Sequence, residues 1–375
     1  MTDVRPDVAP LFEPFTVKSM TSPNRFAMAP MTRSASPGGV PGENVAAYYR
    51  RRAAGGVGLI ITEGVFIPHD AAGGQSNVPR LAGADSLAGW SAVTAAVHGE
   101  GSVIAAQLWH QGVERGVDPE FNPGVESVSP SGLAGDASPR GRALQTGELA
   151  PLAGQYAEAA RSAKAAGFDA VELHGAHGYL LDQFLWERTN VRADGYGGSA
   201  AQRLRFPVEV VRAVRAAVGP DFPILYRFSQ WKQADYTATL ADSPAELEGL
   251  LAPLVDAGVD VFHPPPRRHY VPAFPELGGA DGELSLAGWT KRITGLPAIA
   301  VGSVGLQTEF KPSEVGDIEP APVEAVLRQF ADNEFDVIAV GRALLSDPEW
   351  VNKLRSGRQG EFVGFNIGKA LSALY

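Results

Sequence analysis

The sequence predicts an α/β protein that folds as a single (β/α)8 barrel, a TIM barrel, with an N-terminal hairpin cover and long loops after its strands. Apolar runs of strand length alternate with patterns of helical period along the chain. The composition does not break anywhere between residues 1 and 375, which indicates one domain. No Gly-x-Gly-x-x-Gly motif follows an early strand, which counts against a doubly wound sheet.

The elements follow in order from these patterns. Residues 1–23 form the expected cover, with a small hairpin in 11–23, and residues 359–375 form a tail. Apolar, often β-branched runs predict eight strands at 24–32, 58–67, 102–109, 168–173, 222–228, 259–263, 297–304 and 335–340. Helical spacing of apolar residues predicts helices at 42–54, 86–100, 148–166, 243–257, 285–294, 322–333 and 348–355, and one that carries Leu204 to Val218 on its buried face.

Local signals place the helix ends and the loops. We expect Ser86 and Ser243 to cap their helices, and Pro207 to lie in the first turn of its helix, since a proline further inside would lose a backbone hydrogen bond. The Pro-, Gly- and Ser-rich segment 111–147 is too long for a simple connection, so we expect it to be a lid or a substrate wall. Residues 264–279 form a second long loop.

Composition excludes several function classes. The net charge of −10 argues against binding of nucleic acid or of an acidic membrane surface, because both need a surplus of Lys and Arg. The absence of cysteine rules out disulfides, Cys-ligated clusters and thiol catalysis, and fits a cytoplasmic location. No apolar run reaches membrane-spanning length, and the N-terminus shows no signal peptide. A homodimer is compatible with the sequence, which does not determine the oligomeric state.

Polar residues gather where the predicted strands end. In a parallel barrel the carboxyl ends of the strands share one face, so these residues converge on one pocket. Glycines and an arginine on the last two strands suit a phosphate, while an amide, a cation and two imidazoles suit a planar polar ring such as an isoalloxazine. The residues at these ends are Thr32, Glu63, Gly64, Gln107, Trp109, His174, His177, Tyr179, Arg227, His263, Gly302, Ser303, Gly341 and Arg342.

Each of these residues also has an ordinary interpretation. His174 and His177 alone could be a pair satisfied by the backbone, or two zinc ligands. Tyr179 and Trp109 alone are typical packing residues, and Gln107 alone could close a loop. The functional interpretation therefore depends on their occurring together at one end of a barrel.

Seven stretches of the chain resemble the old yellow enzyme family, whose members are FMN-dependent ene-reductases and include NADH:flavin oxidoreductases and 12-oxophytodienoate reductases. They cover residues 24–358 in the family's order and spacing. Any one alone is modest evidence, but seven in register are strong. The stretches are NRFAMAPMTR, ITEGVFI, QLWHQG, HGAHGYLLDQFL with NVRADGYGGS, the arginine of LYRFS, AVGSVG and VGRALLSDPEW.

The resemblance implies a cofactor, a reductant and a reaction. NAD(P)H reduces a non-covalent FMN, and flavin N5 then passes hydride to the β-carbon of an activated alkene such as an enone, a maleimide or a nitroalkene. His174 and His177 bind the substrate's carbonyl or nitro oxygen, Tyr179 protonates the α-carbon, and Trp109 and Phe66 shape the substrate pocket. No metal is expected. The implied cofactor-binding residues are Ala29, Pro30, Met31, Thr32, Gly64, Gln107, His174, Arg227, Gly302, Ser303, Gly341 and Arg342.

Two rival interpretations stay open at this stage. One is a metal-dependent barrel hydrolase with His110, His174 and His263 as ligands, although an Asp or Glu to complete the site is hard to place. The other is a barrel that binds FMN without catalysis. The sequence also leaves open which tail residue, Phe365 or Tyr375, lies over the flavin, and whether the 264–279 loop, with Arg267, sets substrate preference.

Overall fold

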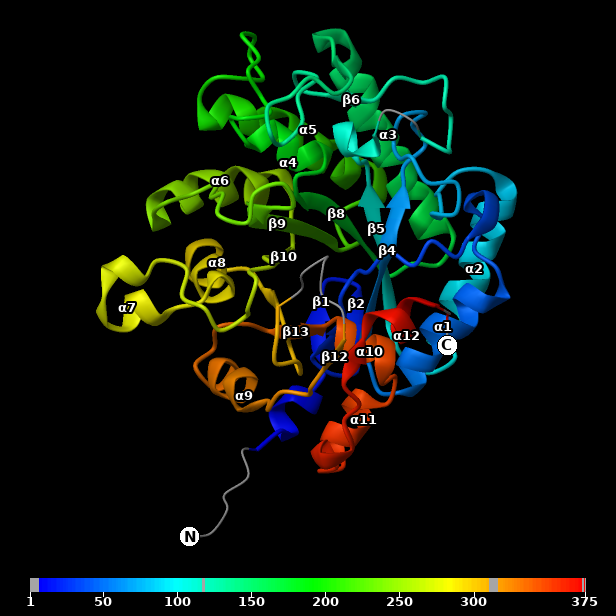
Figure 1. Ribbon diagram of the computed structural model, residues 1–375, viewed down its shortest axis with the longest axis vertical. Coiled ribbons are helices and arrows are strands. Elements are labelled where there is room, and N and C mark those ends of the chain that lie inside the picture. The colour runs from blue at the N-terminus through cyan, green and yellow to red at the C-terminus, as the bar shows by residue number, and fades with distance from the viewer. Residues whose placement is uncertain (1–6, 117–118, 310–315, 373, 375) are drawn as a thin grey trace.

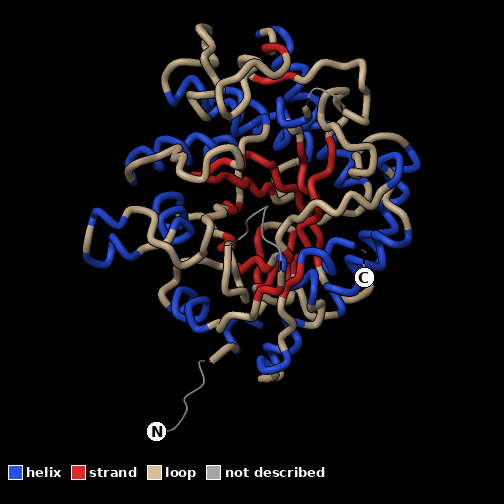
Figure 2. Tube along the Cα trace, viewed as in Figure 1, coloured by secondary structure: helices blue, strands red, loops and turns tan. Residues whose placement is uncertain are grey.

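Eight parallel strands form one sheet at the centre of the molecule. The computed structural model describes residues 7–116, 119–309, 316–372 and 374. The strand order is β10-β9-β8-β5-β4-β3-β13-β11, and a single parallel bridge between Phe262 and Ala298 joins the two end strands. The sheet therefore curls into a nearly closed barrel that helices surround (Figures 1 and 2). This arrangement confirms the predicted (β/α)8 barrel.

The elements have the following bounds. The barrel strands are β3 (Phe26–Met28), β4 (Leu59–Phe66), β5 (Val103–Trp109), β8 (Ala170–His177), β9 (Ile224–Lys232), β10 (Val261–His263), β11 (Ile299–Val301) and β13 (Val337–Val340). The helices are α1 (Glu43–Ala54), α2 (Ala84–His98), α3 (Thr146–Ala165), α4 (Leu180–Leu185), α5 (Ala200–Val218), α6 (Pro244–Ala257), α7 (Gly279–Glu283), α8 (Leu286–Thr294), α9 (Glu324–Ala331), α10 (Arg342–Ser346), α11 (Trp350–Arg355) and α12 (Ile367–Ser372). Three two-stranded sheets pair β1 (Phe15–Val17) with β2 (Met20–Ser22), β6 (Val128–Ser129) with β7 (Arg142–Ala143), and β12 (Asp317–Ile318) with β14 (Phe365–Asn366).

Alternate residues of the strands build two apolar layers. Leu59 and Ile61 of β4 belong to a cluster inside the barrel, whereas Ile60 between them packs in the larger cluster that includes the helices. Both faces of the strands are buried, which explains why the strands read as continuous apolar runs. The β1–β2 hairpin adds Phe15 and Met20 to the inner cluster, so the expected N-terminal cover closes the amino-terminal end of the barrel.

Two predictions about helix starts are wrong. Helix α2 begins at Ala84 after Gly83, and the Ser86 hydroxyl donates to the Arg80 carbonyl oxygen instead of capping the helix. In α5 a capping box at Ser199 fixes the start at Ala200, so Pro207 lies well inside the helix and not in its first turn. Ser243 does cap α6, by accepting a hydrogen bond from the Glu246 N–H.

Strands β8 and β9 run further than their apolar patterns indicate. The sequence predicts that they end at Leu173 and Phe228, but the pairing continues to His177 and Lys232 across a register shift. The residues that follow the predicted end of β8, His174 to His177, therefore belong to the strand and not to a loop.

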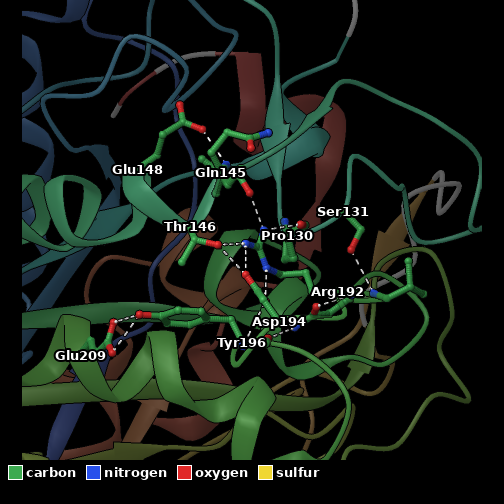
Figure 3. A network of polar contacts seen from close by, with 12 residues as sticks. Pro130, Ser131, Gln145, Thr146, Glu148, Arg192, Asp194, Tyr196 and Glu209 are labelled. Carbon is green, nitrogen blue, oxygen red and sulfur yellow. Dashed lines mark hydrogen bonds and ion pairs between the residues drawn. The ribbon is translucent and has the colours of Figure 1, made fainter.

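The 111–147 segment is bound to the loop that follows α4. Figure 3 shows Arg192 at the centre of this contact. Its guanidinium donates to the carbonyl oxygens of Pro130 (2.9 Å) and Leu144, and it pairs with Asp194 at 2.6 Å. Asp194 in turn accepts a hydrogen bond from the Thr146 hydroxyl at 2.7 Å. The two loops thus form one layer over this side of the barrel.

Candidate active site

A cavity of about 640 Å³ opens at the carboxyl ends of the barrel strands. We call it the main cavity. A site is predicted here because the carboxyl ends of parallel barrel strands share one face. The cavity brings together residues from both ends of the chain. The predicted site residues that line it are Ala29, Pro30, Met31, Thr32, Gln107, Trp109, His174, His177, Tyr179, Arg227, Gly302, Ser303, Gly341 and Arg342.

Gly64 and Phe66 do not line the main cavity, and neither do Glu63 and His263 of the strand-end set. The Phe66 ring is fully buried behind Trp109, with 5.2 Å between the ring centroids. Gly64 has Trp109 where a side chain would be, since an added Cβ would lie 2.4 Å from that ring. The prediction that Phe66 lines the substrate pocket is therefore wrong: Phe66 supports Trp109, and Gly64 makes room for it.

The end of β8 presents two histidines and a tyrosine to the main cavity. The chain can turn here because His177 and Gly178 both adopt positive φ, of 66° and 87°. The His177 N–H donates to the Ser229 hydroxyl at 2.8 Å, which ties the turn to β9. The His174 ring centroid lies 5.6 Å from that of His177 and 4.9 Å from that of Tyr179, and both pairs of rings are close to perpendicular.

Both histidines are neutral at physiological pH. Burial lowers the pKa of His174 and of His177 well below the usual histidine value, and the charge of Arg227 lowers both further. The His174 Nδ1 and His177 Nε2 atoms are buried and have no hydrogen-bond partner among the described residues. Unpaired buried polar atoms carry a free-energy cost, so two such atoms on one cavity wall favour a ligand that pairs with them.

Tyr179 keeps its proton across the physiological range. Burial raises its pKa to about 12, although a hydrogen bond from Gln233 has the opposite effect. Gln233 Nε2 lies 2.9 Å from the Tyr179 hydroxyl oxygen and donates to it, which leaves the phenol proton for another acceptor. Burial therefore makes this phenol a weaker acid than an ordinary tyrosine.

A buried ion pair holds the same turn from below. Lys232 Nζ lies 2.8 Å from Asp182 Oδ1, and both side chains have no exposed surface. The second oxygen of Asp182 accepts the Gly178 N–H at 2.6 Å. The end of β9 and the start of α4 are thereby linked on either side of Tyr179, so the phenol is carried on a restrained backbone.

Gln107 and Arg227 form a polar layer with the barrel interior beneath them. Gln107 Nε2 donates to Glu172 at 2.8 Å, and the other Glu172 oxygen lies 2.6 Å from His263 Nδ1. The side chains of all four residues are largely or fully buried, and Arg227 Nε has no hydrogen-bond partner among the described residues. This layer supplies an amide and a cation to the main cavity.

The other end of the cavity is cationic and rich in glycine. Gly302 and Ser303 follow β11, and Gly341 and Arg342 follow β13, which is its neighbour in the sheet. Gly302 has φ 130°, and its backbone lies so close to the Pro266 carbonyl that an added Cβ would be 2.8 Å from that oxygen. Close backbone and a nearby guanidinium are the features that bind a phosphate.

Sequence reasoning did not single out Trp231, Gln233 and Tyr236, which form part of the wall. Trp231 stacks on His177 with 4.3 Å between ring centroids, and Arg267 lies over the rings of Trp231 and Tyr236. All of these residues line the cavity, as does Gln233. Trp231 lies in the part of β9 that continues past the apolar run ending at Phe228, so the apolar pattern gave no signal for it. The 264–279 loop contributes Pro265, Pro266 and Arg267, and the tail contributes Phe365 of the same chain, while Tyr375 lies outside the described residues.

Two other expectations are not met. None of the described residues of 111–147 lines the main cavity, so the prediction that this loop is a wall of the site is wrong. The three histidines of the metal hypothesis are also separated by their contacts: His110 pairs with His69 at 3.0 Å and His263 pairs with Glu172. No group of three or more His, Cys, Asp or Glu side chains is placed to hold a metal ion within the described ranges.

Comparison with known proteins gives a consistent result. A model of the NADH:flavin oxidoreductase / NADH oxidase family matches residues 10–265. An NADH oxidase of Thermoanaerobacter brockii is 34% identical over 366 residues, which are 96% of this chain and 53% of that protein, so the chain spans about half of its length. Chanoclavine-I aldehyde reductase of Penicillium roqueforti is 36% identical over 353 residues, or 92% of this chain and 89% of that protein.

Solved structures agree with the sequence matches. Morphinone reductase in complex with tetrahydroNAD superposes with a TM-score of 0.76 at 31% identity, over 93% of this chain and 91% of that chain. An old yellow enzyme homologue of Zymomonas mobilis gives a TM-score of 0.77 at 26% identity, over 96% of each chain. Fold, strand-end residues and both kinds of match agree, and the chain belongs to the NADH:flavin oxidoreductase / NADH oxidase family, the family of old yellow enzyme.

Proposed function

We propose that this protein is an FMN-dependent ene-reductase that uses NAD(P)H to reduce small activated alkenes. The observation that supports it most directly is the juxtaposition of His174, His177 and Tyr179 at one wall of the main cavity. Two neutral imidazoles there have buried nitrogens without partners, and a phenol retains its proton. An acceptor oxygen beside a carbon that needs a proton would use all three groups.

The residues of the main cavity fit FMN. Gln107 and Arg227 supply an amide and a cation for a pyrimidine edge, and Ala29 to Thr32 supply a largely apolar surface beside it. Gly302, Ser303, Gly341 and Arg342 would hold the phosphate. When bound, FMN supplies the two-electron chemistry by accepting hydride from NAD(P)H and giving hydride to the substrate.

The residues of the chain would perform the polar half of the reaction. The N–H groups of His174 and His177 would donate to the carbonyl or nitro oxygen and stabilise the negative charge that develops there, and each such donor is worth about 10²–10³ in rate. Tyr179 would give its hydroxyl proton to the α-carbon. Its pKa of about 12 keeps the proton in place until the carbon becomes basic. Trp109 and Trp231 would limit the shape of the substrate.

Replacing Tyr179 with Phe tests this assignment. In anaerobic stopped-flow experiments, we expect flavin reduction by NADPH or NADH to stay near the wild-type rate. Reoxidation by 2-cyclohexenone should slow by about 10²-fold or more, because the general acid is lost. Tyr156→Phe is the control, since Tyr156 is buried in α3 and does not line the cavity.

The outcomes separate the alternatives. Wild-type rates in both half-reactions of Tyr179→Phe would contradict the role of this residue. A flavin-loaded wild-type protein that NAD(P)H reduces but that cyclohexenone, maleimides and nitroalkenes all fail to reoxidise would favour a barrel that binds FMN without this catalysis.

A further inference from the structure

Glu172 is a charged side chain that the proposed reaction does not use, yet it lies directly beneath the main cavity. It belongs to β8, has no exposed surface, and pairs in register with Gln107 of β5. Burial alone would raise its pKa, but His263 and the charge of Arg227 hold that pKa below the usual value for glutamate. Glu172 is therefore a carboxylate inside the barrel.

Both carboxylate oxygens of Glu172 accept a hydrogen bond. Oε1 accepts a hydrogen bond from Gln107 Nε2 at 2.8 Å, and Oε2 accepts one from His263 Nδ1 at 2.6 Å. Burial lowers the pKa of His263, so the ring is neutral and its one N–H must be on Nδ1. His263 thus holds Glu172 in place, and the two side chains act as one support under Gln107.

This support orients the Gln107 amide. An ionised carboxylate can only accept hydrogen bonds, so the amide must turn its NH₂ group toward Glu172 and its oxygen away from it. The side of Gln107 that lines the main cavity then presents an acceptor, next to the guanidinium donors of Arg227. An acceptor beside a donor is complementary to an imide edge, in which an N–H is flanked by a carbonyl.

The same carboxylate also offsets a charge. Arg227 is buried, and its Nε has no hydrogen-bond partner among the described residues. A lone guanidinium in this environment would be expensive to bury and would strongly favour any negative charge that forms in the cavity. Glu172 brings the net charge of this layer close to zero.

We propose that Glu172, held by His263, is a positioning residue that fixes the Gln107 amide as an acceptor for the imide N–H of the flavin ring and that lowers the reduction potential of the bound flavin. The proposal rests on the proposed function, because it assumes that FMN occupies the main cavity. Reduction adds negative charge to the ring, so a carboxylate beneath it disfavours the reduced form, while Arg227 favours it.

The test compares three variants of the full chain with the wild type. Glu172→Gln removes the charge and the obligatory acceptor. Glu172→Asp keeps the charge, but its shorter side chain moves the carboxylate away from Gln107 and His263. Glu334→Gln is the control, because Glu334 is also a buried carboxylate that accepts from a backbone N–H and a glutamine amide, and it does not line the cavity. Kd for FMN is measured by fluorescence quenching, and the midpoint potential by anaerobic dye titration.

Each variant has a distinct expected result. Glu172→Gln should raise the midpoint potential and weaken FMN binding by about tenfold or more, the loss expected when a buried hydrogen bond is mispaired. Glu172→Asp should also weaken FMN binding. Its midpoint potential should differ from the wild-type value by less than the midpoint potential of Glu172→Gln does. Glu334→Gln should match the wild type in both quantities.

The outcome that overturns the inference differs from the one that overturns the proposed function. If the wild type binds FMN and Glu172→Gln shows an unchanged potential and Kd, the role of Glu172 is wrong and the flavin site stands. If Glu172→Gln does not fold, the inference depends on Glu172→Asp, and wild-type FMN affinity in that variant overturns it. A wild-type protein that binds no FMN contradicts the proposed function itself.

Discussion

Buried carboxylates in this barrel differ in how their charge is compensated. Glu172 has a histidine hydrogen bond and a neighbouring guanidinium, and its pKa is held low. Glu63, on the adjacent part of the barrel, accepts the backbone N–H groups of Arg33 (2.8 Å) and Ser34 (3.0 Å). Burial raises the pKa of Glu63 to about 7, against the effect of those two hydrogen bonds and of the Arg33 charge. The first carboxylate is built to be charged, and the second is easily neutralised.

Glu63→Gln should change how stability depends on pH. The folded pKa of about 7 lies above the unfolded value of 4.5, so between these values the folded protein binds a proton that the unfolded chain has lost. Stability from this group is therefore fully present below pH 4.5 and falls as pH rises to 7. We expect the free energy of unfolding of the variant, relative to wild type, to rise by about 2–3 kcal/mol between pH 5 and pH 8.

Urea unfolding at several pH values measures this difference. The contributions of other titrating groups to the free energy of unfolding are the same in both proteins and cancel in the comparison. A difference between variant and wild type that stays constant from pH 5 to pH 8 would contradict the raised pKa. Arg33 and Thr32 line the main cavity close to these hydrogen bonds, so FMN binding should be compared over the same pH range.

Single residues also show how far the sequence could predict the site. His174, Gln107 and Arg227 were found because barrel strands end on one face, which requires only the strand assignment. Phe66 was assigned to the substrate pocket only by the family resemblance, and the sequence alone does not show that its ring packs behind Trp109. Glu172 was not singled out, because an acidic residue within an apolar run shows its partners only in three dimensions.

At the scale of elements, the loop after β10 and the end of β11 depend on each other. The His269 N–H donates to the Gly302 carbonyl oxygen at 3.0 Å, and the Ser303 hydroxyl donates to the Arg267 carbonyl oxygen at 3.2 Å. This contact lets residues 265–267 form one wall of the main cavity and leaves no room for a side chain at position 302.

Gly302→Ala should therefore displace the loop. The added Cβ would lie 2.8 Å from the Pro266 carbonyl oxygen, in a residue with φ 130°. Gly316→Ala is the control, because Gly316 has φ 125° and none of the described residues lies within 4 Å of the added atom. Both variants carry the backbone strain, so we expect Gly302→Ala to lose about 1–3 kcal/mol more in urea unfolding. It should also weaken FMN binding, and equal losses in the two variants would contradict the close contact.

Element boundaries were predictable where local chemistry decides them and not elsewhere. The Ser243 cap was predicted correctly, whereas β8 and β9 continue past their apolar runs because each provides ladder partners for the other. The length of the 111–147 segment predicted a lid or a substrate wall, but length does not tell on which side a loop packs, and none of its described residues lines the main cavity. Its partner is Arg192 and the loop after α4, away from the main cavity.

In the described part of the chain, the barrel carries the main cavity at the carboxyl ends of its strands, and a hairpin closes the opposite end. Among the described residues, no helix combines the length and the apolar character that crossing a bilayer requires. The cytoplasmic location and the homodimer that the sequence allows stay predictions. The net charge of −10 makes the binding of anionic cofactors depend on local groups such as Arg342.

The central claim is that this cavity holds FMN, and a visible absorbance spectrum of the purified protein tests it most directly. We predict a flavin spectrum, and FMN in the supernatant, in an amount close to one per chain, after the protein is denatured by heat. A colourless protein that also fails to take up added FMN would contradict the account, because the amide, the cations and the glycines of the main cavity would then serve another ligand.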